Sequence, residues 1–67
     1  MQLIINGENV TINEDIQTIA DVIDTLGLKN KIVIIELNGD IVLKEEHPNR
    51  KVKHGDRMEL VHFVGGG

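Results

Sequence analysis

The sequence has no cysteine, tryptophan or tyrosine, and it has one phenylalanine among its 67 residues. The absence of cysteine excludes disulfides, thiolate metal sites and thiol chemistry on any side chain. A single aromatic residue cannot form a base-stacking surface, and a net charge of −4 repels a phosphate backbone, so nucleic-acid binding is not expected. No apolar run approaches the roughly 20 residues of a membrane span, so no membrane segment is expected either.

The length allows one small domain. A chain of this size buries only about 60% of its unfolded surface, so its stability must come from a well-patterned core or from a partner. The opening residues MQLIING carry no basic segment of the kind that begins a secretory signal. We therefore expect a cytoplasmic protein.

Alternating apolar residues predict two β-hairpins. The segments QLIINGENVTI and KIVIIELNGDIVL each alternate around an Asn-Gly pair, at Asn6-Gly7 and at Asn38-Gly39. Both residue types tolerate positive φ, which makes Asn-Gly a strong signal for a tight hairpin turn. In the second hairpin the alternation turns Ile35 inward and Ile34 outward.

One helix of about three turns is predicted over residues 18–27. Thr18 followed by Asp21 resembles a capping box, and Gly27 fits the position after the last helical residue. The apolar positions share one helical face: Ile19, Val22, Ile23 and Leu26.

The order of these elements predicts an α+β fold. Residues 44–53 are polar and contain Pro48, which indicates a loop, and RMELVHF at residues 57–63 is the last strand. A single short helix must lie across one face of the sheet, and the first and last strands then pair centrally and in parallel. We predict a ubiquitin-like β-grasp domain at residues 1–64, with a mixed sheet of about five strands, and a flexible glycine tail at residues 65–67.

The last strand predicts an apolar patch on the uncovered face of the sheet. If Met58 and Leu60 face the helix, Val61 and Phe63 face away from it, and Ile34 on the neighbouring strand joins them. Val64 continues this surface, so we expect partner docking at Ile34, Val61, Phe63 and Val64. The alternative is that a small protein simply exposes some apolar side chains.

The polar residues do not indicate catalysis or metal binding. His47, His54 and His62 lack the spacing of a metal site and are expected to be exposed or lightly buried. Glu45 and Glu46 are adjacent in a charged loop, where a solvated surface is the simpler interpretation. We expect no catalytic residue and no bound cofactor in this chain.

The end of the sequence offers the most accessible reactive group. Gly67 carries an α-carboxylate, and Gly65 and Gly66 lack the Cβ atoms that would clash in a narrow channel of a partner enzyme. A carboxylate becomes reactive towards nucleophiles once it is adenylated. The alternative is a frayed terminus without a role.

These segments, from INGENV to the ending VHFVGGG, make the chain closely similar over its whole length to the ThiS family of bacterial sulfur carriers. The resemblance implies that a ThiF-type enzyme adenylates Gly67 with Mg-ATP, and that a persulfide donor converts the product to a thiocarboxylate. It further implies that the carrier docks on a ThiG-type thiazole synthase and delivers sulfur for thiamine biosynthesis. Gly66 and Gly67 match the family's terminal motif, and from the resemblance we expect that no trimming after Gly67 is needed.

Three other interpretations stay open at the level of sequence. Sulfur carriers for molybdopterin or another sulfur metabolite share the fold and the diglycine end. A ubiquitin-like modifier would join Gly67 to a lysine of another protein. A passive interaction module would use only Ile34, Val61 and Phe63.

Overall fold

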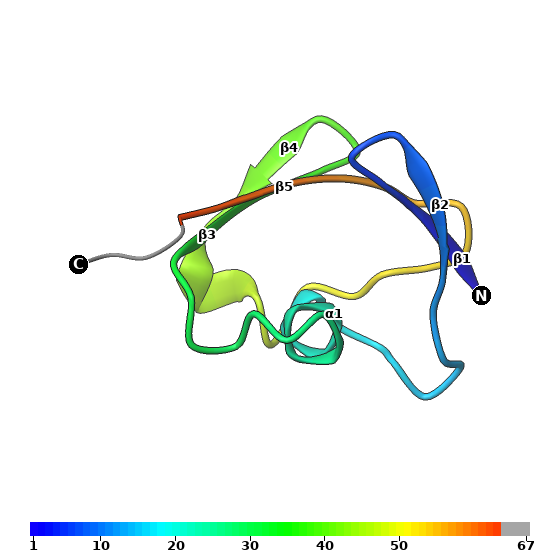
Figure 1. The fold of residues 1–67 in the computed structure, drawn as a ribbon, viewed down its shortest axis with the longest axis horizontal. Coiled ribbons are helices and arrows are strands. Elements are labelled where there is room, and N and C mark those ends of the chain that lie inside the picture. Colours follow the sequence, from blue (N-terminus) through cyan, green and yellow to red (C-terminus); the bar gives the residue numbers. More distant parts are fainter. Residues whose placement is uncertain (64–67) are drawn as a thin grey trace.

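A five-stranded mixed sheet curves over one α-helix in the computed structural model, which describes residues 1–63 (Figure 1). The elements are β1 (Gln2–Ile5), β2 (Glu8–Thr11), α1 (Ile19–Thr25), β3 (Val33–Leu37), β4 (Asp40–Val42), the 3₁₀ helix η1 (Lys44–Glu46) and β5 (Arg57–His62). The strand order is β2-β1-β5-β3-β4, with β1 and β5 parallel and the other neighbours antiparallel. This is the predicted β-grasp arrangement, with the last strand in the centre.

Both predicted hairpin turns are confirmed. Asn6 and Gly7 have φ angles of 50° and 82°, and Asn38 and Gly39 have φ angles of 51° and 90°. Positive φ at both central residues is the geometry of a type I′ turn, whose twist matches that of the strands it joins. The two Asn-Gly pairs therefore set the register of both hairpins.

The start of α1 has a reciprocal cap. The Asp21 N–H donates to Thr18 Oγ1 at 3.2 Å, and the N–H groups of Gln17 and Thr18 donate to Asp21 Oδ2 at 3.0 and 3.1 Å. The hydrogen bonds from the Gln17 and Thr18 amides hold the pKa of the Asp21 carboxyl below its usual value. The capping box that the sequence predicted is thus confirmed.

The end of α1 is a Schellman motif. The Gly27 N–H donates to the Asp24 carbonyl and the Leu28 N–H donates to the Ile23 carbonyl, both at 3.0 Å. Gly27 has a φ of 77°, which a residue with a Cβ rarely adopts. The helix proper spans seven residues, or two turns. It is shorter than the predicted three turns because the residues at both ends of the predicted segment act as caps.

The core lies between α1 and the concave face of the sheet. The predicted alternation is confirmed, since Ile35, Met58 and Leu60 are buried while Ile34 and Val61 are exposed. The buried apolar side chains are Leu3, Ile5, Ile12, Ile19, Val22, Ile23, Ile35, Leu37, Val42, Val52, Met58 and Leu60.

The segment between β4 and β5 differs from the prediction of an irregular polar loop. It begins with η1, which turns the chain so that His47 is 6% exposed. The His47 carbonyl accepts a hydrogen bond of 3.0 Å from the Ala20 N–H, and His47 Nε2 lies 3.3 Å from the Val42 carbonyl oxygen. The expectation of an exposed or lightly buried His47 is therefore wrong, because this residue joins the segment to α1 and to β4.

Candidate functional site

An apolar patch lies on the convex face of the sheet, on the side that α1 does not cover. Ile34 of β3 and Val61 of β5 are directly opposite each other and are 51% and 55% exposed. Phe63, also 55% exposed, donates its N–H to the Ile32 carbonyl at 3.1 Å and so continues the β3–β5 pairing one step past His62. We call Ile32, Ile34, Val61 and Phe63 the outer patch. The predicted exposure of the last three is confirmed.

The outer patch lies where β5 ends. In Figure 1, β5 runs from right to left along the middle of the sheet and ends at the left, beside the start of β3. The predicted site residues Val64, Gly65, Gly66 and Gly67 lie outside the described residues, as does the predicted domain boundary at residue 64. The geometry thus places the apolar surface immediately before the segment to which the sequence assigned the chemistry.

On its β1 side, β5 is held by a side chain as well as by backbone. The Ile4 N–H donates to the Asp56 carbonyl and the Asn6 N–H donates to the Met58 carbonyl, both at 2.9 Å. Beyond these backbone bonds, the Asn6 side chain continues the pairing with β5. Its Oδ1 accepts from the Leu60 N–H at 2.7 Å and its Nδ2 donates to the Leu60 carbonyl at 3.0 Å. The amide of Asn6 therefore acts as one further strand residue beside β5.

On its β3 side, β5 begins at a second asparagine and a buried carboxylate. Asn38 Oδ1 accepts from the Arg57 N–H and Asn38 Nδ2 donates to Asp56 Oδ1, both at 3.0 Å. Asp56 is 4% exposed and also accepts from the backbone N–H and the Nζ of Lys53, at 2.8 and 3.0 Å. Burial acts to raise the pKa of Asp56, but the hydrogen bonds from Asn38 and Lys53 outweigh it and lower that pKa.

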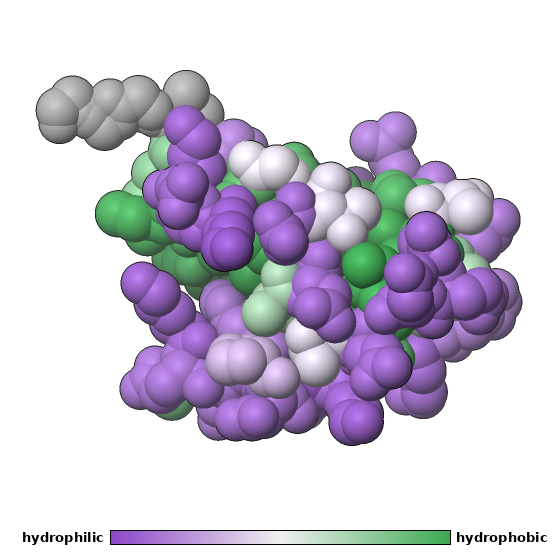
Figure 2. All heavy atoms as spheres, turned by 90° about the horizontal axis from the view of Figure 1, so that it is seen from below, coloured by the Kyte–Doolittle hydropathy of each residue, from purple (hydrophilic) through white to green (hydrophobic). Residues whose placement is uncertain are grey.

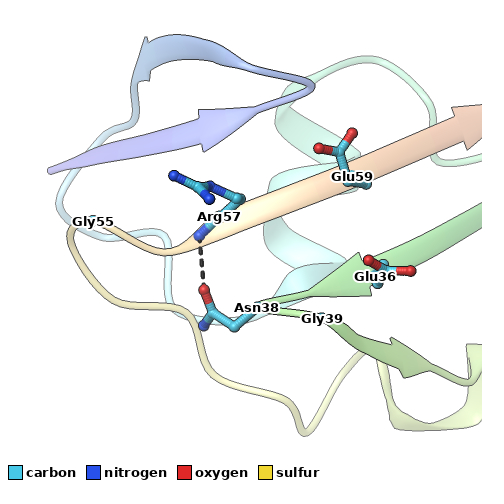
Figure 3. Close-up of a pocket in the computed structure, with 6 residues that line it drawn as sticks. All are labelled: Glu36, Asn38, Gly39, Gly55, Arg57 and Glu59. Atoms are coloured by element: carbon cyan, nitrogen blue, oxygen red, sulfur yellow. Dashed lines mark hydrogen bonds between the residues drawn. The ribbon is translucent and has the colours of Figure 1, made fainter.

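A polar groove lies on the same convex face at the start of β5, whereas the outer patch lies at its end (Figure 3). The carboxylates of Glu36 and Glu59 stand on neighbouring strands at directly paired positions. The Arg57 side chain extends from β5 towards β1, away from both carboxylates. The groove combines charges of both signs, and it is not an enclosed cavity that would shield a reaction from water.

The histidines do not come together. His54 is exposed, with its Nδ1 accepting from the Gln2 N–H at 3.0 Å, and His62 is exposed at the end of β5. Within residues 1–63, no three His, Asp or Glu side chains are placed to hold a metal ion. In the same range, no helix is long and apolar enough to cross a membrane.

Sequence reasoning did not find the residues that hold β5 in place. The sequence patterns indicate Asn6 and Asn38 as turn residues only, and no pattern singles out Asp56. One signal was available, because both hairpins use Asn rather than Asp or Gly before the glycine. Of these three residues, Asn alone has a side chain that both donates and accepts.

The comparisons with known proteins agree with this architecture. The ThiS family profile matches residues 3–67. The chain is 43% identical to the sulfur carrier protein ThiS of Bacillus subtilis over 63 residues, which cover 94% of this chain and 96% of that one. The crystal structure of ThiS from Geobacter metallireducens superposes with a TM-score of 0.81 at 30% identity, with both chains fully covered. An NMR structure of that protein gives 0.80 at 30% identity and covers 100% of this chain and 88% of that one.

A further relative is a much longer protein. The chain is 36% identical over all of its 67 residues to a thiazole synthase of Paramagnetospirillum magneticum, of which it spans only 20%. Together, three findings establish the ubiquitin-like β-grasp fold and the family of the chain: the family profile, the Bacillus subtilis relative that the chain covers almost completely, and the superposed structures. The chain belongs to the ThiS family, the sulfur carrier proteins of thiamine biosynthesis, and is a carrier rather than an enzyme.

Proposed function

We propose that the chain carries sulfur as a thiocarboxylate on Gly67 and delivers it to a thiazole synthase of the ThiG type. Residues 1–64 form the domain that partners recognise, and Gly65 and Gly66 form the slim part of a tail that enters each partner's active site. The outer patch, continued by Val64, is the docking surface. The chain itself holds no cofactor, and ATP and Mg²⁺ are supplied at the activating enzyme.

The chemistry needs three steps, which begin at the Gly67 carboxylate. In the first, a ThiF-type enzyme directs the carboxylate onto the α-phosphate of ATP, which forms an acyl-adenylate and releases pyrophosphate. In the second, the terminal sulfur of a persulfide displaces AMP to form an acyl persulfide. A thiol then attacks the outer sulfur of this group, breaks the S–S bond, forms a disulfide with the donor and releases the thiocarboxylate. Since the chain lacks cysteine, sulfur cannot be carried on a side-chain thiol.

The observation that carries the proposal is the position of the outer patch at the end of β5. A carrier whose reactive group lies at its terminus must be bound by its partner close to that terminus, so that the tail reaches the partner's active site in one orientation. Ile34, Val61 and Phe63 offer exposed apolar surface at this point, beside the chain's exit from the sheet. Contiguous exposed apolar surface of this kind is typical of an interaction site.

The thiazole synthase relative supports the choice of partner. A segment of that enzyme is similar to this chain along its full length, so the two kinds of domain occur in one polypeptide. Two functions that are joined in one protein often act together when they occur as separate proteins. We extend this link to the present chain, as the acceptor of its sulfur.

Pyrophosphate exchange by the ThiF-type enzyme tests the proposal. We expect the wild-type chain to support ATP–pyrophosphate exchange, and a chain without Gly67, or with one residue added after it, to lose that exchange. Thermal unfolding is the control, since both variants should melt at the wild-type temperature. Full exchange by either variant would refute the role of the Gly67 carboxylate.

A further inference from the structure

A small basic recess opens on the helix side of the molecule, between the end of α1, the start of β3 and the segment after η1. Its volume is about 110 Å³. It is lined by the aliphatic side chains of Ile23, Ile32 and Val33 and by the polar side chains of Lys29, Lys31, Lys44 and His47. We call this feature the basic recess.

The charge of the recess is opposite to that of the chain as a whole. The chain has 11 acidic and seven basic residues, apart from histidine, yet three of the seven basic residues line this one recess and no carboxylate does. Among residues 1–63, none of the three ammonium groups forms a salt bridge. Three lysine ammonium groups without a salt bridge, next to aliphatic side chains, create a local positive potential that favours an anionic group.

The two carboxylates of an adjoining depression do not neutralise it. Asp21 and Asp24 line an adjoining depression that also touches Lys29, Lys44 and His47. The Asp21 carboxylate is already the acceptor of the helix cap, through the N–H groups of Gln17 and Thr18. No ammonium group in the described part of the chain lies within 4 Å of either aspartate.

His47 adds a polar atom that the fold does not use. Its Nε2 faces the Val42 carbonyl oxygen, which can only accept, so this nitrogen is the donor and carries the proton. No side-chain hydrogen bond within residues 1–63 involves Nδ1, and no fully buried side-chain nitrogen there lacks a partner, so Nδ1 is in contact with solvent. His47 is only 6% exposed and lines both the recess and the adjoining depression, so this nitrogen is available to a group bound there.

The recess is continuous with the outer patch. Ile32 belongs to both, since it lines the recess and its carbonyl accepts the Phe63 N–H. Figure 2 shows the helix side as mainly hydrophilic, with apolar atoms emerging at the left, the end at which β5 stops in Figure 1. A partner that covers Phe63 and Ile32 therefore has the basic recess within reach of the same interface.

We propose that the basic recess receives one carboxylate side chain, an aspartate or glutamate, of the thiazole synthase that docks on the outer patch. The inference rests on the proposed function and adds a charged contact to its apolar interface. A recess of about 110 Å³ has room for one carboxylate group. The aliphatic part of its lining fits the methylene carbons of such a side chain, and the lysine ammonium groups fit its oxygens.

Charge reversal with a matched control tests this contact. We would measure the affinity of the thiazole synthase for the wild-type chain, Lys31→Glu, Lys44→Glu and Lys51→Glu by titration calorimetry at low and high salt. Lys51 is exposed and lines neither the recess nor the outer patch, yet its reversal changes the net charge equally. We expect each recess variant to bind about tenfold more weakly at low salt, and Lys51→Glu to stay within about twofold of wild type. Unfolding temperatures should be unchanged in all three.

The ring signals of His47 provide a second readout that does not depend on a substitution. On addition of the synthase, we expect the His47 ring resonances to shift and those of His54 to stay in place, because His54 lines neither the recess nor the adjoining depression. Inorganic phosphate, added to the free carrier instead, should leave the His47 signals unchanged up to millimolar concentration. A clear shift with phosphate would show that the recess binds a small oxyanion rather than a side-chain carboxylate, and this result would overturn the proposal.

The outcomes separate this inference from the proposed function. If the wild-type chain binds the synthase and both recess variants bind as tightly as Lys51→Glu, the recess contact is wrong and the carrier function stands. If the wild-type chain does not bind the synthase, the proposed partner is wrong and the recess contact fails with it. Selective weakening of both recess variants, with the His47 shift, supports the contact.

Discussion

The side-chain amide of Asn6 hydrogen bonds to both the N–H and the carbonyl of Leu60, at 2.7 and 3.0 Å. The two residues are 54 positions apart in sequence, and the contact fixes β5 immediately before Val61 and Phe63. A residue of the first hairpin turn thus sets the position of the strand that carries the outer patch. Leu60 would otherwise present unpaired backbone groups at the point where β1 ends.

Removal of this amide should loosen the end of β5. We expect Asn6→Gly to lower the free energy of unfolding by about 1–2 kcal/mol, because two hydrogen bonds to partly buried backbone groups are lost. Glycine is the appropriate replacement, since Asn6 has a φ of 50° and alanine would add strain. Amide hydrogen exchange should show faster exchange at Leu60, with Ile35 as an internal reference. Unchanged protection of the Leu60 amide would contradict the role of Asn6.

Stability should depend on pH through Asp56. Its pKa is lowered in the folded protein, so its contribution is complete above the unfolded value of about 3.9 and is lost as pH falls through the folded value. We expect the wild-type free energy of unfolding to decrease below about pH 4. Asp56→Asn should cost about 2 kcal/mol at pH 7 and should reduce this acid slope, leaving the part that comes from Asp21, because the Asp56 carboxylate is replaced by a group that does not titrate. A slope in the variant as steep as that of the wild type would show that other groups control acid stability.

The outer patch should matter for docking more than for folding. Phe63→Ala should weaken binding to the thiazole synthase by about tenfold and change the free energy of unfolding by less than about 0.5 kcal/mol. Ile41→Ala is the control, because Ile41 is 68% exposed and lies on the same face beside Glu36, away from the outer patch. Its binding should remain near wild type. If Phe63→Ala unfolds the domain, Phe63 is a core residue.

The Glu36–Glu59 pair should slightly lower the free energy of unfolding of the isolated domain. The two carboxylates face each other across β3 and β5, and like charges at directly opposite positions are destabilising. We expect Glu59→Gln to raise the free energy of unfolding by about 0.5 kcal/mol at low salt, and to have less effect at high salt because of screening. Chemical unfolding at two salt concentrations measures this. A loss of stability on neutralisation would mean that Glu59 makes a favourable contact.

Local signals in the sequence were sufficient for most of the fold. Asn6-Gly7 and Asn38-Gly39 fixed two turns, because few residue pairs accept positive φ twice. The cap at Thr18 and the stop at Gly27 bounded the helix, and alternation separated the buried Ile35 from the exposed Ile34. Each of these features depends on residues that are close in sequence.

The features that the sequence did not reveal depend on contacts between distant residues. His47 is buried because η1 turns it towards Val42 and α1, which no local pattern near Pro48 indicates. The basic recess gathers Lys29 and Lys31 with Lys44 from separate segments, and each lysine alone resembles an ordinary surface residue. The outer patch was found because its members alternate along two predicted strands.

The mass and position of a single sulfur atom test the central claim most directly. The chain is incubated with the ThiF-type enzyme, Mg-ATP, a persulfide donor and a thiol, in parallel with the same chain amidated at the carboxyl group of Gly67. The account predicts that the free-acid chain gains the mass difference between sulfur and oxygen, that fragmentation places this gain at Gly67, and that the amidated chain is unchanged. Sulfur gained by the amidated chain, or located upstream of Gly67, would contradict it.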